Sequence, residues 1–407
     1  MKHAIALFAS CFLISLTSPG QLVSAQENTD IKELVHGNTQ FAIELYNKME
    51  MKEGNLFFSP YSISTSLAMT YRGAREDTAK QMAAVLHFSL EGEKLHSAFK
   101  DMQSKLNAIQ RKKEIQLNVA NSLWPQNRYP FLKEYLILAK KYYQTEITPL
   151  DYKTNPGVAS KKINSWVEEK TNNKIKDIIS TLPDPSTRLI LVNAIYFKGN
   201  WASQFKKSAT TQMPFYLTES KSIEVPMMHQ TSTFNYGEEE SLQVLELPYV
   251  GNELSMLVIL PKKTDGLQNL GEILAKDSLD WWTRNLSNSM VEVYVPRFKM
   301  TSEFSLDEEL KSMGMINAFE MDKANFSGMD GNQNWLYIGA VLHKAFVDVN
   351  EEGTEAAAAT AVHTREKSAP PKPVIFRADH PFLFLIRENS TRSILFMGRL
   401  INPLMMD

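Results

Sequence analysis

Cysteine is almost absent from this chain of 407 residues, in which Cys11 is the only one. One thiol cannot form a disulfide within the chain, and the sequence has no cluster of cysteine and histidine that would hold a metal ion. A protein of this length must therefore be stabilised by its hydrophobic core rather than by cross-links. Thiol catalysis and redox chemistry are not expected from any residue after Cys11.

An excess of charge of one sign is lacking as well, because 44 lysines and arginines oppose 46 aspartates and glutamates and give a formal net charge of −2. The chain therefore has no overall basic field that would attract nucleic acid or an acidic membrane. Beyond the amino terminus, no apolar run is long enough to span a bilayer. We expect a monomer that binds neither nucleic acid nor membrane.

Catalytic motifs are the third absence. The sequence contains no His-Glu-x-x-His, no Gly-x-Ser-x-Gly and no glycine-rich phosphate loop, so we expect no enzymatic activity, no cofactor and no metal. A serine hydrolase assembled from distant residues stays open, because a Ser-His-Asp site needs no sequence adjacency. His343 lies in an apolar run, where a lone histidine is more often a hydrogen-bonded core residue than a base.

The amino terminus has the layout of a cleavable signal peptide. A basic start precedes an apolar stretch from Ala4 to Leu16, and small residues that end at Ala25 match a cleavage site. We expect residues 1–25 to be removed and residues 26–407 to form one exported domain, extracellular or, in a bacterium, periplasmic. A lipoprotein site at Cys11 is the less favoured alternative, because apolar residues continue past it.

Helical spacing dominates the first half of the chain. An apolar stripe follows a possible helix cap at Asn38-Thr39-Gln40 and consists of Phe41, Ala42, Leu45, Tyr46 and Met49. We predict an amphipathic helix that faces the core and begins at this cap.

Strand patterns dominate the second half. Residues 189–197 and 256–261 are continuous apolar runs, typical of strands that are buried on both faces. Residues 291–296 alternate between apolar and polar side chains, as a half-exposed strand does. We therefore predict one α+β domain with large, mainly antiparallel sheets.

The most distinctive segment, residues 351–373, combines a run of small residues with a polar, proline-rich continuation. An extended conformation would place on one face of a sheet the alternate residues Thr354, Ala356, Ala358, Thr360 and Val362. Four consecutive alanines favour a helix in isolation, so the segment has no single local preference. Its conformation must be decided by context, which suits a conformational switch.

A segment of this composition is usually an exposed linker. Two strongly apolar runs follow it, however, at residues 381–386 and 393–398, and the polar stretch between them indicates a β-hairpin. An isolated hairpin is only marginally stable in water, so this one must pack into the body that precedes the loop. The segment is therefore an exposed excursion from one domain, and long loops of this kind are more often functional than not.

Together these features resemble the serpin family over essentially the whole of residues 26–407. The matching segments are Asn55–Ser64, Leu191–Trp201, Val295–Phe298, Leu310–Gly314, Ala324–Gly328 and His380–Phe384. Residues 351–362 resemble the hinge of the family almost residue for residue. The resemblance implies an α+β serpin fold of three β-sheets and about nine helices, with an exposed reactive-centre loop above the largest sheet.

The resemblance also implies suicide inhibition of serine proteases. A target protease would attack the loop as a substrate and form an acyl-enzyme. Before water can release the enzyme, the cut loop would insert as a new strand of the central sheet and carry the tethered protease away. The uncut protein would therefore be a metastable state.

By the family pattern, the hinge consists of Glu351, Gly353, Thr354, Ala356, Ala357, Ala358 and Ala359. Gly353 would give the backbone its freedom to move, and the small side chains after it suit insertion. A polar cluster where the sheet opens would be formed by Ser59, Ser62, Asn193 and His343, and Trp201 would lie near the point where insertion starts.

Counting along the loop of the family places the scissile bond between Lys367 and Ser368. Lysine before this bond suits trypsin-like proteases, whose specificity pocket is acidic. Arg365 offers a second basic site, and Glu366 should repel some enzymes of this class. We expect a covalent complex with a trypsin-like serine protease, and subtilisin-like enzymes stay open. The alternative is a non-inhibitory serpin that acts as a carrier or chaperone.

Two further expectations concern partners and location. The basic residues Lys105, Arg111, Lys112 and Lys113 could align along a helix and bind a sulfated polysaccharide, although acidic neighbours also fit an ordinary solvated face. The hinge is most similar to the intracellular branch of the family, whereas the amino terminus predicts export. We expect secretion, because all three parts of a signal peptide are present.

Overall fold

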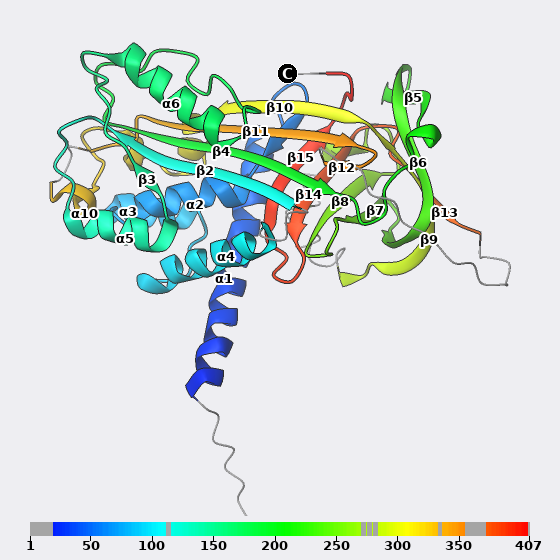
Figure 1. The fold of residues 1–407 in the computed structure, drawn as a ribbon, viewed down its shortest axis with the longest axis horizontal. Coiled ribbons are helices and arrows are strands. Elements are labelled where there is room, and N and C mark those ends of the chain that lie inside the picture. Colours follow the sequence, from blue (N-terminus) through cyan, green and yellow to red (C-terminus); the bar gives the residue numbers. More distant parts are fainter. Residues whose placement is uncertain are drawn as a thin grey trace, which may run out of the picture.

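The computed structural model describes residues 19–110, 115–269, 284–332, 336–354 and 372–405, together with residues 274 and 279. This part of the chain forms two β-sheets with helices around them (Figure 1). Its eight α-helices are α1 (Pro19–Met49), α2 (Pro60–Tyr71), α3 (Glu76–Val85), α4 (Glu93–Gln110), α5 (Lys133–Tyr143), α6 (Pro156–Lys170), α9 (Asp307–Ser312) and α10 (Ser327–Asp330). No helix in these residues combines the length and the hydropathy needed to cross a membrane.

The six-stranded sheet has the strand order β10, β11, β12, β4, β2 and β3. The bounds of these strands are β2 (Ile115–Pro125), β3 (Glu146–Ile147), β4 (Leu189–Asn200), β10 (Phe298–Ser305), β11 (Ala340–Asn350) and β12 (Gly353–Thr354). The long central strands β4 and β11 run parallel to each other, as do β2 and β3, while β10 is antiparallel to β11 and β2 is antiparallel to β4.

The nine-stranded sheet has the order β1, β15, β14, β8, β7, β6, β9 and β13, and β5 also pairs with β6. The bounds are β1 (Leu56–Phe58), β5 (Thr211–Thr218), β6 (Lys221–Glu238), β7 (Leu242–Pro248), β8 (Leu254–Pro261), β9 (Ser287–Pro296), β13 (Val374–Arg377), β14 (Phe382–Glu388) and β15 (Ile394–Leu400).

The predicted α+β class is confirmed, but the described strands form two hydrogen-bonded sheets where the resemblance implied three. The reason is the 18-residue strand β6. It pairs with β9 over residues 227–236, and its other edge pairs with β5 over residues 221–227 and with β7 over residues 235–238. One strand thus joins two sheet regions, and β5, β6, β9 and β13 lie together at one end of the molecule (Figure 1).

The two faces of the six-stranded sheet are covered by different elements. On one face, Ile163 of α6 belongs to the same buried cluster as Val192 of β4 (Figure 1). On the other face, Phe197 of β4 is buried with Phe384 and Phe396 of the nine-stranded sheet. Because side chains alternate along a strand, β4 is buried on both faces, as its continuous apolar run predicts.

The strands predicted from apolar runs are present, as is the carboxyl-terminal hairpin. Strands β4, β8 and β9 contain the predicted segments, and β14 pairs antiparallel with β15 from the Phe382–Leu400 pair onward. Strand β8 on one side and β1 on the other flank this hairpin, so it is an internal part of the sheet. The residues that follow the loop therefore belong to the body of the domain.

The predicted start of the first helix is wrong. Helix α1 begins at Pro19, and Asn38 lies in its interior rather than at its cap. Asn38 is only 4% exposed, and its Oδ1 accepts a hydrogen bond from Ser64 Oγ of α2 at 2.7 Å. A polar residue that precedes an apolar stripe can thus be a buried hydrogen-bonding residue as well as a cap. The stripe itself, from Phe41 to Met49, is buried as predicted.

Helix α2 carries two of the predicted polar residues beneath the six-stranded sheet. Ser59 caps its amino terminus, because its Oγ accepts a hydrogen bond from the backbone N–H of Ser62 at 3.1 Å. Pro60 occupies the first helical position, where no backbone donor is needed. The helix is buried from Pro60 to Thr70 and contacts β2, β4 and β15. This local sequence therefore fixes the positions of both serines.

Candidate functional site

The seam between β4 and β11 is closed over most of its length and open at one end. Residues 340–346 of β11 pair directly with residues 190–196 of β4. Beyond them, β12 lies between the two strands, with Thr354 opposite Val349 on one side and Gly199 on the other. The hinge thus supplies the first two residues of a strand within the seam.

Gly353 is required at the point where the chain turns into the seam. Its φ of +155° is a backbone conformation that side-chain-bearing residues rarely adopt. A Cβ atom at this position would lie 2.1 Å from the carbonyl oxygen of Gly199 and 2.6 Å from the Cα of Asn200. Only glycine lets β12 approach β4 this closely.

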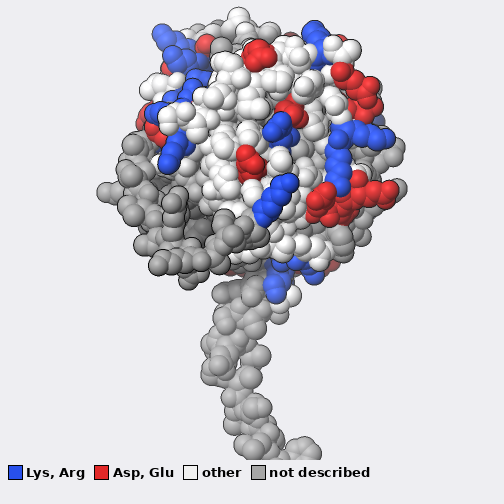
Figure 2. Space-filling view, turned by 90° about the vertical axis from the view of Figure 1, so that its right-hand side faces the viewer, with Lys and Arg blue, Asp and Glu red and all other residues white. Residues whose placement is uncertain are grey.

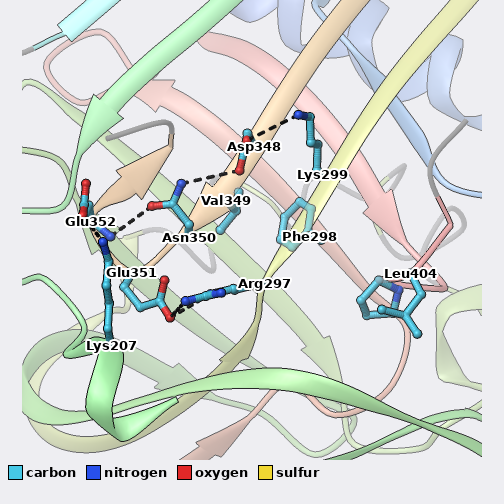
Figure 3. Close-up of a pocket in the computed structure, with 11 residues that line it drawn as sticks. Lys207, Arg297, Phe298, Lys299, Asp348, Val349, Asn350, Glu351, Glu352 and Leu404 are labelled. Atoms are coloured by element: carbon cyan, nitrogen blue, oxygen red, sulfur yellow. Dashed lines mark hydrogen bonds and ion pairs between the residues drawn. The ribbon is translucent and has the colours of Figure 1, made fainter. Parts of the chain in front are cut away.

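Glu351 anchors the turn that precedes β12. Its side chain is 2% exposed and accepts a hydrogen bond from Arg297 Nε at 2.7 Å (Figure 3). It accepts another from Thr210 Oγ1 at 2.6 Å. Its carbonyl oxygen accepts a further bond from the N–H of Phe205 at 2.9 Å. Burial raises the pKa of the Glu351 carboxyl, but the bonds from Arg297 and Thr210 outweigh it and hold the pKa below its usual value.

Two further ion pairs flank this anchor. Lys207 Nζ lies 2.6 Å from Glu352 Oε1, and Lys299 Nζ lies 3.8 Å from Asp348 Oδ2. These residues line a cavity of about 550 Å³, and Leu404 lies on its opposite side (Figure 3). Each acidic residue of the turn is therefore held by a cation from another part of the fold.

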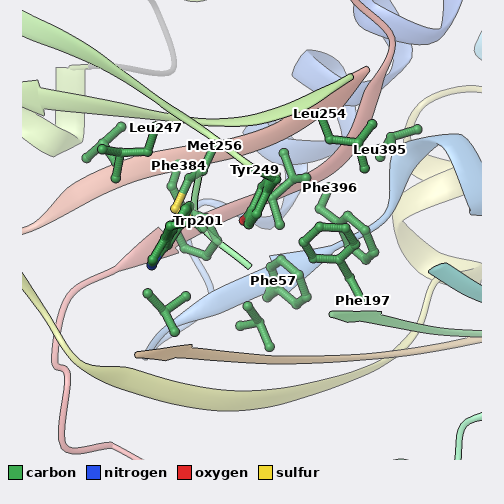
Figure 4. Close-up of a cluster of buried hydrophobic side chains, with 14 of the residues drawn as sticks. Phe57, Phe197, Trp201, Leu247, Tyr249, Leu254, Met256, Phe384, Leu395 and Phe396 are labelled. Atoms are coloured by element: carbon green, nitrogen blue, oxygen red, sulfur yellow. The ribbon is translucent and has the colours of Figure 1, made fainter. Parts of the chain in front are cut away.

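Trp201 packs against the hinge from the core side. Its ring stacks on Tyr249 with centroids 4.7 Å apart (Figure 4). Its Nε1 donates a hydrogen bond to the carbonyl oxygen of Asn350 at 3.0 Å. The hydroxyls of Tyr249 and Thr354 lie 2.9 Å apart, and Thr354 is fully buried. The first inward-facing residue of β12 thus already has a hydrogen-bond partner in the core.

A buried polar cluster lies beneath the closed part of the seam. Nε2 of His343 on β11 accepts a hydrogen bond from the N–H of Ser59 at 3.1 Å, and its Nδ1 contacts Oδ1 of Asn193 on β4. Nδ2 of Asn193 donates to Ser62 Oγ and to Oδ1 of Asn121 on β2. These side chains connect three strands of the sheet to α2.

The imidazole of His343 is neutral in this cluster. Its side chain is fully buried, and burial lowers its pKa to about 3. One ring nitrogen accepts from Ser59, so the other carries the proton and donates to Asn193. Protonation of the accepting nitrogen would break the bond to Ser59, which makes the cluster sensitive to acid.

The structure brings four of the predicted cluster residues together, namely Ser59, Ser62, Asn193 and His343. Trp201 lies apart from them at the open end of the seam, in contact with the hinge. Their roles in sheet opening stay predictions.

Several predicted residues lie outside the described residues. They are Lys367 and Ser368 of the reactive bond, Ala356, Ala357, Ala358 and Ala359 of the hinge, and Arg111, Lys112 and Lys113 of the polysaccharide site. Lys105 is described and is half-buried on α4.

Sequence reasoning missed three residues of this site: Asn121, Arg297 and Tyr249. Asn121 joins the polar cluster because its strand position lies opposite Asn193. Arg297 and Tyr249 contact residues that are 54 and 105 positions away in the chain. Arg297 lies within Val295–Phe298, one of the segments that carry the resemblance, and this is the signal that could have pointed to it.

The face that carries the end of the nine-stranded sheet shows no concentration of one charge. Lysine, arginine, aspartate and glutamate side chains are interspersed on it, with neutral surface between them (Figure 2). The described residues on this face therefore form no basic patch of the kind that dominates polyanion binding.

The fold and the hinge together define a protein whose central sheet holds the first residues of an additional strand. The sequence model described as "Serpin (serine protease inhibitor)" matches residues 36–403. The chain therefore belongs to the serpin family of serine protease inhibitors.

Relatives and solved structures agree with this assignment. The chain is 43% identical to leukocyte elastase inhibitor of Xenopus laevis, with 90% of this chain and 98% of that protein covered. It is 42% identical to Serpin B4 of Homo sapiens, with 92% of this chain and 100% of that protein covered. It also resembles the structure of human thyroxine-binding globulin complexed with thyroxine, with a TM-score of 0.83 and 32% identity. That match covers 92% of this chain and 99% of the other.

Proposed function

We propose that this protein is a suicide inhibitor of trypsin-like serine proteases, which cut it between Lys367 and Ser368. The observation that carries the proposal is the position of β12, which pairs with β4 and β11 at once. A cut loop needs only to continue a strand that has already begun.

The register of the sheet supports insertion without a shift. Continued from Thr354, an antiparallel strand would place residue 360 opposite Asn193 of β4 and equally opposite His343 of β11. Asn193 and His343 are already partners across the closed seam. The two strands can therefore separate and accept the loop with the same residues in line.

The side chains of the loop fit the two faces that they would meet. Positions 356, 358 and 362 would face the core beside Phe197, Ile195 and Leu191, where Ala356, Ala358 and Val362 add apolar surface of small or moderate volume. Insertion would complete backbone hydrogen bonds on both sides of the new strand and bury this surface, so it would release free energy. The uncut protein would be the less stable state.

The chemical step would be the ordinary first half of proteolysis. The serine Oγ of the protease attacks the carbonyl carbon of Lys367, the bond to the nitrogen of Ser368 breaks, and the protease histidine gives the proton to the leaving amine. An ester links Lys367 to the enzyme until water attacks it. Insertion that is faster than this hydrolysis would trap the ester.

The alternatives to this target class rest on the comparisons. Relatives named leukocyte elastase inhibitor make an elastase-like enzyme a competing target. Elastase has a small specificity pocket and would cut after a small residue of the loop rather than after Lys367. The likeness to thyroxine-binding globulin supports a carrier function as the non-inhibitory alternative.

The test is an equimolar mixture with trypsin, examined on a denaturing gel for a complex that survives boiling. We expect a covalent band together with a released fragment that begins at Ser368 by mass spectrometry. Lys367→Ala should abolish the band, and Arg365→Ala is the matched control that should keep it. A band unchanged by Lys367→Ala would reject this reactive bond, and clean cleavage by both trypsin and elastase without a band would favour the carrier.

Two finer expectations belong to the same proposal. We propose that residues 1–25 direct export, although a cut after Ala25 would fall inside α1. Sequencing the amino terminus of the exported protein tests this.

Binding of a sulfated polysaccharide through Lys105, Arg111, Lys112 and Lys113 is tested by the salt dependence of heparin affinity in a variant that lacks these four charges.

A further inference from the structure

A groove lies at the far end of the seam, opposite to the hinge. It encloses about 380 Å³ between the segment that follows α6 and the beginnings of β4 and β11. Its lining combines apolar and acidic side chains and includes Ile178, Asp184, Ile190, Glu303, Phe304 and Leu342. The groove is on the same face of the sheet as α6, because Ile178, Ile190 and Leu342 belong to the cluster that α6 covers.

The segment that follows α6 crosses the seam above this groove. Lys344 Nζ of β11 donates a hydrogen bond to the carbonyl oxygen of Lys176 at 2.8 Å. Lys174 Nζ lies over the ring of Phe346, 5.7 Å from its centroid. The groove thus has the sheet as its floor and this segment as one wall. It is an opening that exists before the seam separates.

The length of chain between the hinge and the reactive bond ends at this groove. A strand that continues from Thr354 reaches residue 363 after nine further positions, opposite Ile190 on β4 and Ala340 on β11. Ile190 and Ala340 are the last pair of the closed seam, and both line the groove. Residues 363–367 would therefore leave the sheet here.

The alternation of side chains decides which of these residues enter the groove. Thr354 faces the core, so position 363 and position 365 would face the side of α6. These positions are His363 and Arg365. The end of the inserted loop would thus present one aromatic and one cationic side chain to the groove.

The groove has a carboxylate that no cation neutralises within the described residues. The Asp184 side chain is exposed, and its carboxylate is hydrogen-bonded to Ser186, whose N–H donates to Oδ1 at 2.7 Å. Glu303, by contrast, is paired with Lys344 at 2.6 Å. The nearby Arg188 donates from Nη1 to the carbonyl oxygen of Ser186 at 2.7 Å. Asp184 is therefore the available partner for an added cation.

We infer that this groove is the seat of the cut loop's end, in which His363 packs over Ile190 and the guanidinium of Arg365 pairs with Asp184. The inference rests on the proposed function and deepens it, because it assigns a role to a basic residue that is not the cleavage site. The pair forms only after insertion. It holds the end of the loop, and with it the acylated Lys367, at the far pole of the sheet.

The lifetime of the covalent complex tests this seat. Asp184→Asn keeps the acceptor for Ser186 but removes the charge, and it should raise the rate at which a preformed complex with trypsin releases active enzyme by about 2- to 5-fold, the effect of one partly exposed ion pair. Arg365→Asp should act alike. The double variant Asp184→Arg with Arg365→Asp should restore the parent rate.

The controls separate this inference from the proposed function. Asp177→Asn removes an exposed charge that lies outside the groove lining, and it should leave release unchanged. The denaturation midpoint of the uncut protein should be the same in all variants. If the complex forms but Asp184→Asn and Asp177→Asn release trypsin alike, the groove is not the seat and the inhibitor function stands. If the parent protein forms no complex, both proposals fail.

Discussion

At the residue scale, the hinge depends on a few contacts that tolerate no added atom. Gly353 touches the backbone of β4, and Thr354 shares a hydrogen bond with Tyr249 inside the core. His343 and Asn193 connect β11 and β4, the two strands that the proposed mechanism requires to part. Substitutions at these positions therefore change how firmly the first residues of the additional strand are held, rather than the chemistry of the protease.

Gly353→Ala should destabilise the uncut protein. The new Cβ would lie 2.1 Å from the carbonyl oxygen of Gly199, so β12 must move away from β4. We expect a loss of about 1–3 kcal/mol, measured as a lower midpoint of urea denaturation. Gly157→Ala is the matched control, because a Cβ there meets no atom within 4 Å. Equal midpoints for both variants would show that β12 does not occupy the seam.

Acid should weaken the polar cluster through His343. Burial lowers its pKa from 6.5 to about 3, so below pH 6.5 the unfolded chain binds a proton that the folded protein does not. The stabilisation is thus complete above pH 6.5 and is lost as the pH falls toward 3. At about pH 5 the loss from this group should be about 2 kcal/mol.

Urea denaturation at about pH 7.5 and about pH 5 measures this effect. His96, whose pKa burial lowers to about 4, contributes with the same sign. His343→Gln should therefore reduce the difference between the two pH values without abolishing it. A variant with the full pH difference of the parent protein would contradict the assignment of a neutral, buried His343.

At the scale of elements, the turn between β11 and β12 is held by cations from elsewhere in the chain. Arg297 lies just before β10, and Lys207 lies beyond the end of β4. The pairs restrain the turn just before Gly353 and Thr354 enter the seam. The anchoring is therefore a property of packed elements and not of the loop sequence alone.

Glu351→Gln should loosen this turn. It removes the carboxylate charge that Arg297 faces at a side chain only 2% exposed, although Arg297 itself is 41% exposed, which moderates the effect. We expect a loss of about 1–3 kcal/mol in unfolding free energy, measured by urea denaturation. Asp77→Asn is the control, because its pair with Lys80 is exposed on both sides. Equal effects of the two changes would reject the anchor.

At the scale of the whole molecule, the proposed mechanism requires the six-stranded sheet to open between β4 and β11. Strands β4 and β11 pair directly, and on the α6 face the segment that follows α6 is hydrogen-bonded to β11 through Lys344. The core on the other side is continuous with the nine-stranded sheet. Under the proposed mechanism, opening the seam would have to move packed layers, which would make it slow before the loop is cut.

Cleavage of the loop should raise the stability of the molecule as a whole. The cut chain can fill the seam, so its urea midpoint should lie well above that of the uncut protein. Thr354→Arg should abolish this rise, because a charged side chain cannot enter the fully buried site beside Tyr249. The same variant should become a substrate of trypsin instead of an inhibitor. A rise that survives Thr354→Arg would reject insertion from β12.

Much of the fold could be predicted from the sequence, because continuous or alternating apolar runs leave few choices for a strand. The segments that became β4, β8, β9 and the β14–β15 hairpin all have such runs. The helix start at Asn38 could not be predicted, since its partner Ser64 lies 26 residues away. The joining of two sheet regions through β6 could not be predicted either. The pattern of apolar and polar residues indicates that a segment is a strand, but it does not indicate which other strands it pairs with.

The sequence by itself determined which residues can form an extended strand with small side chains, and where a glycine and a threonine stand at its start. Those are local properties of side-chain size and alternation. Only the tertiary structure decided that Gly353 and Thr354 lie between β4 and β11, that Arg297 and Tyr249 hold this hinge, and that a groove lies nine positions further along the seam. These contacts join residues that are distant in the chain, and no local pattern encodes such distances.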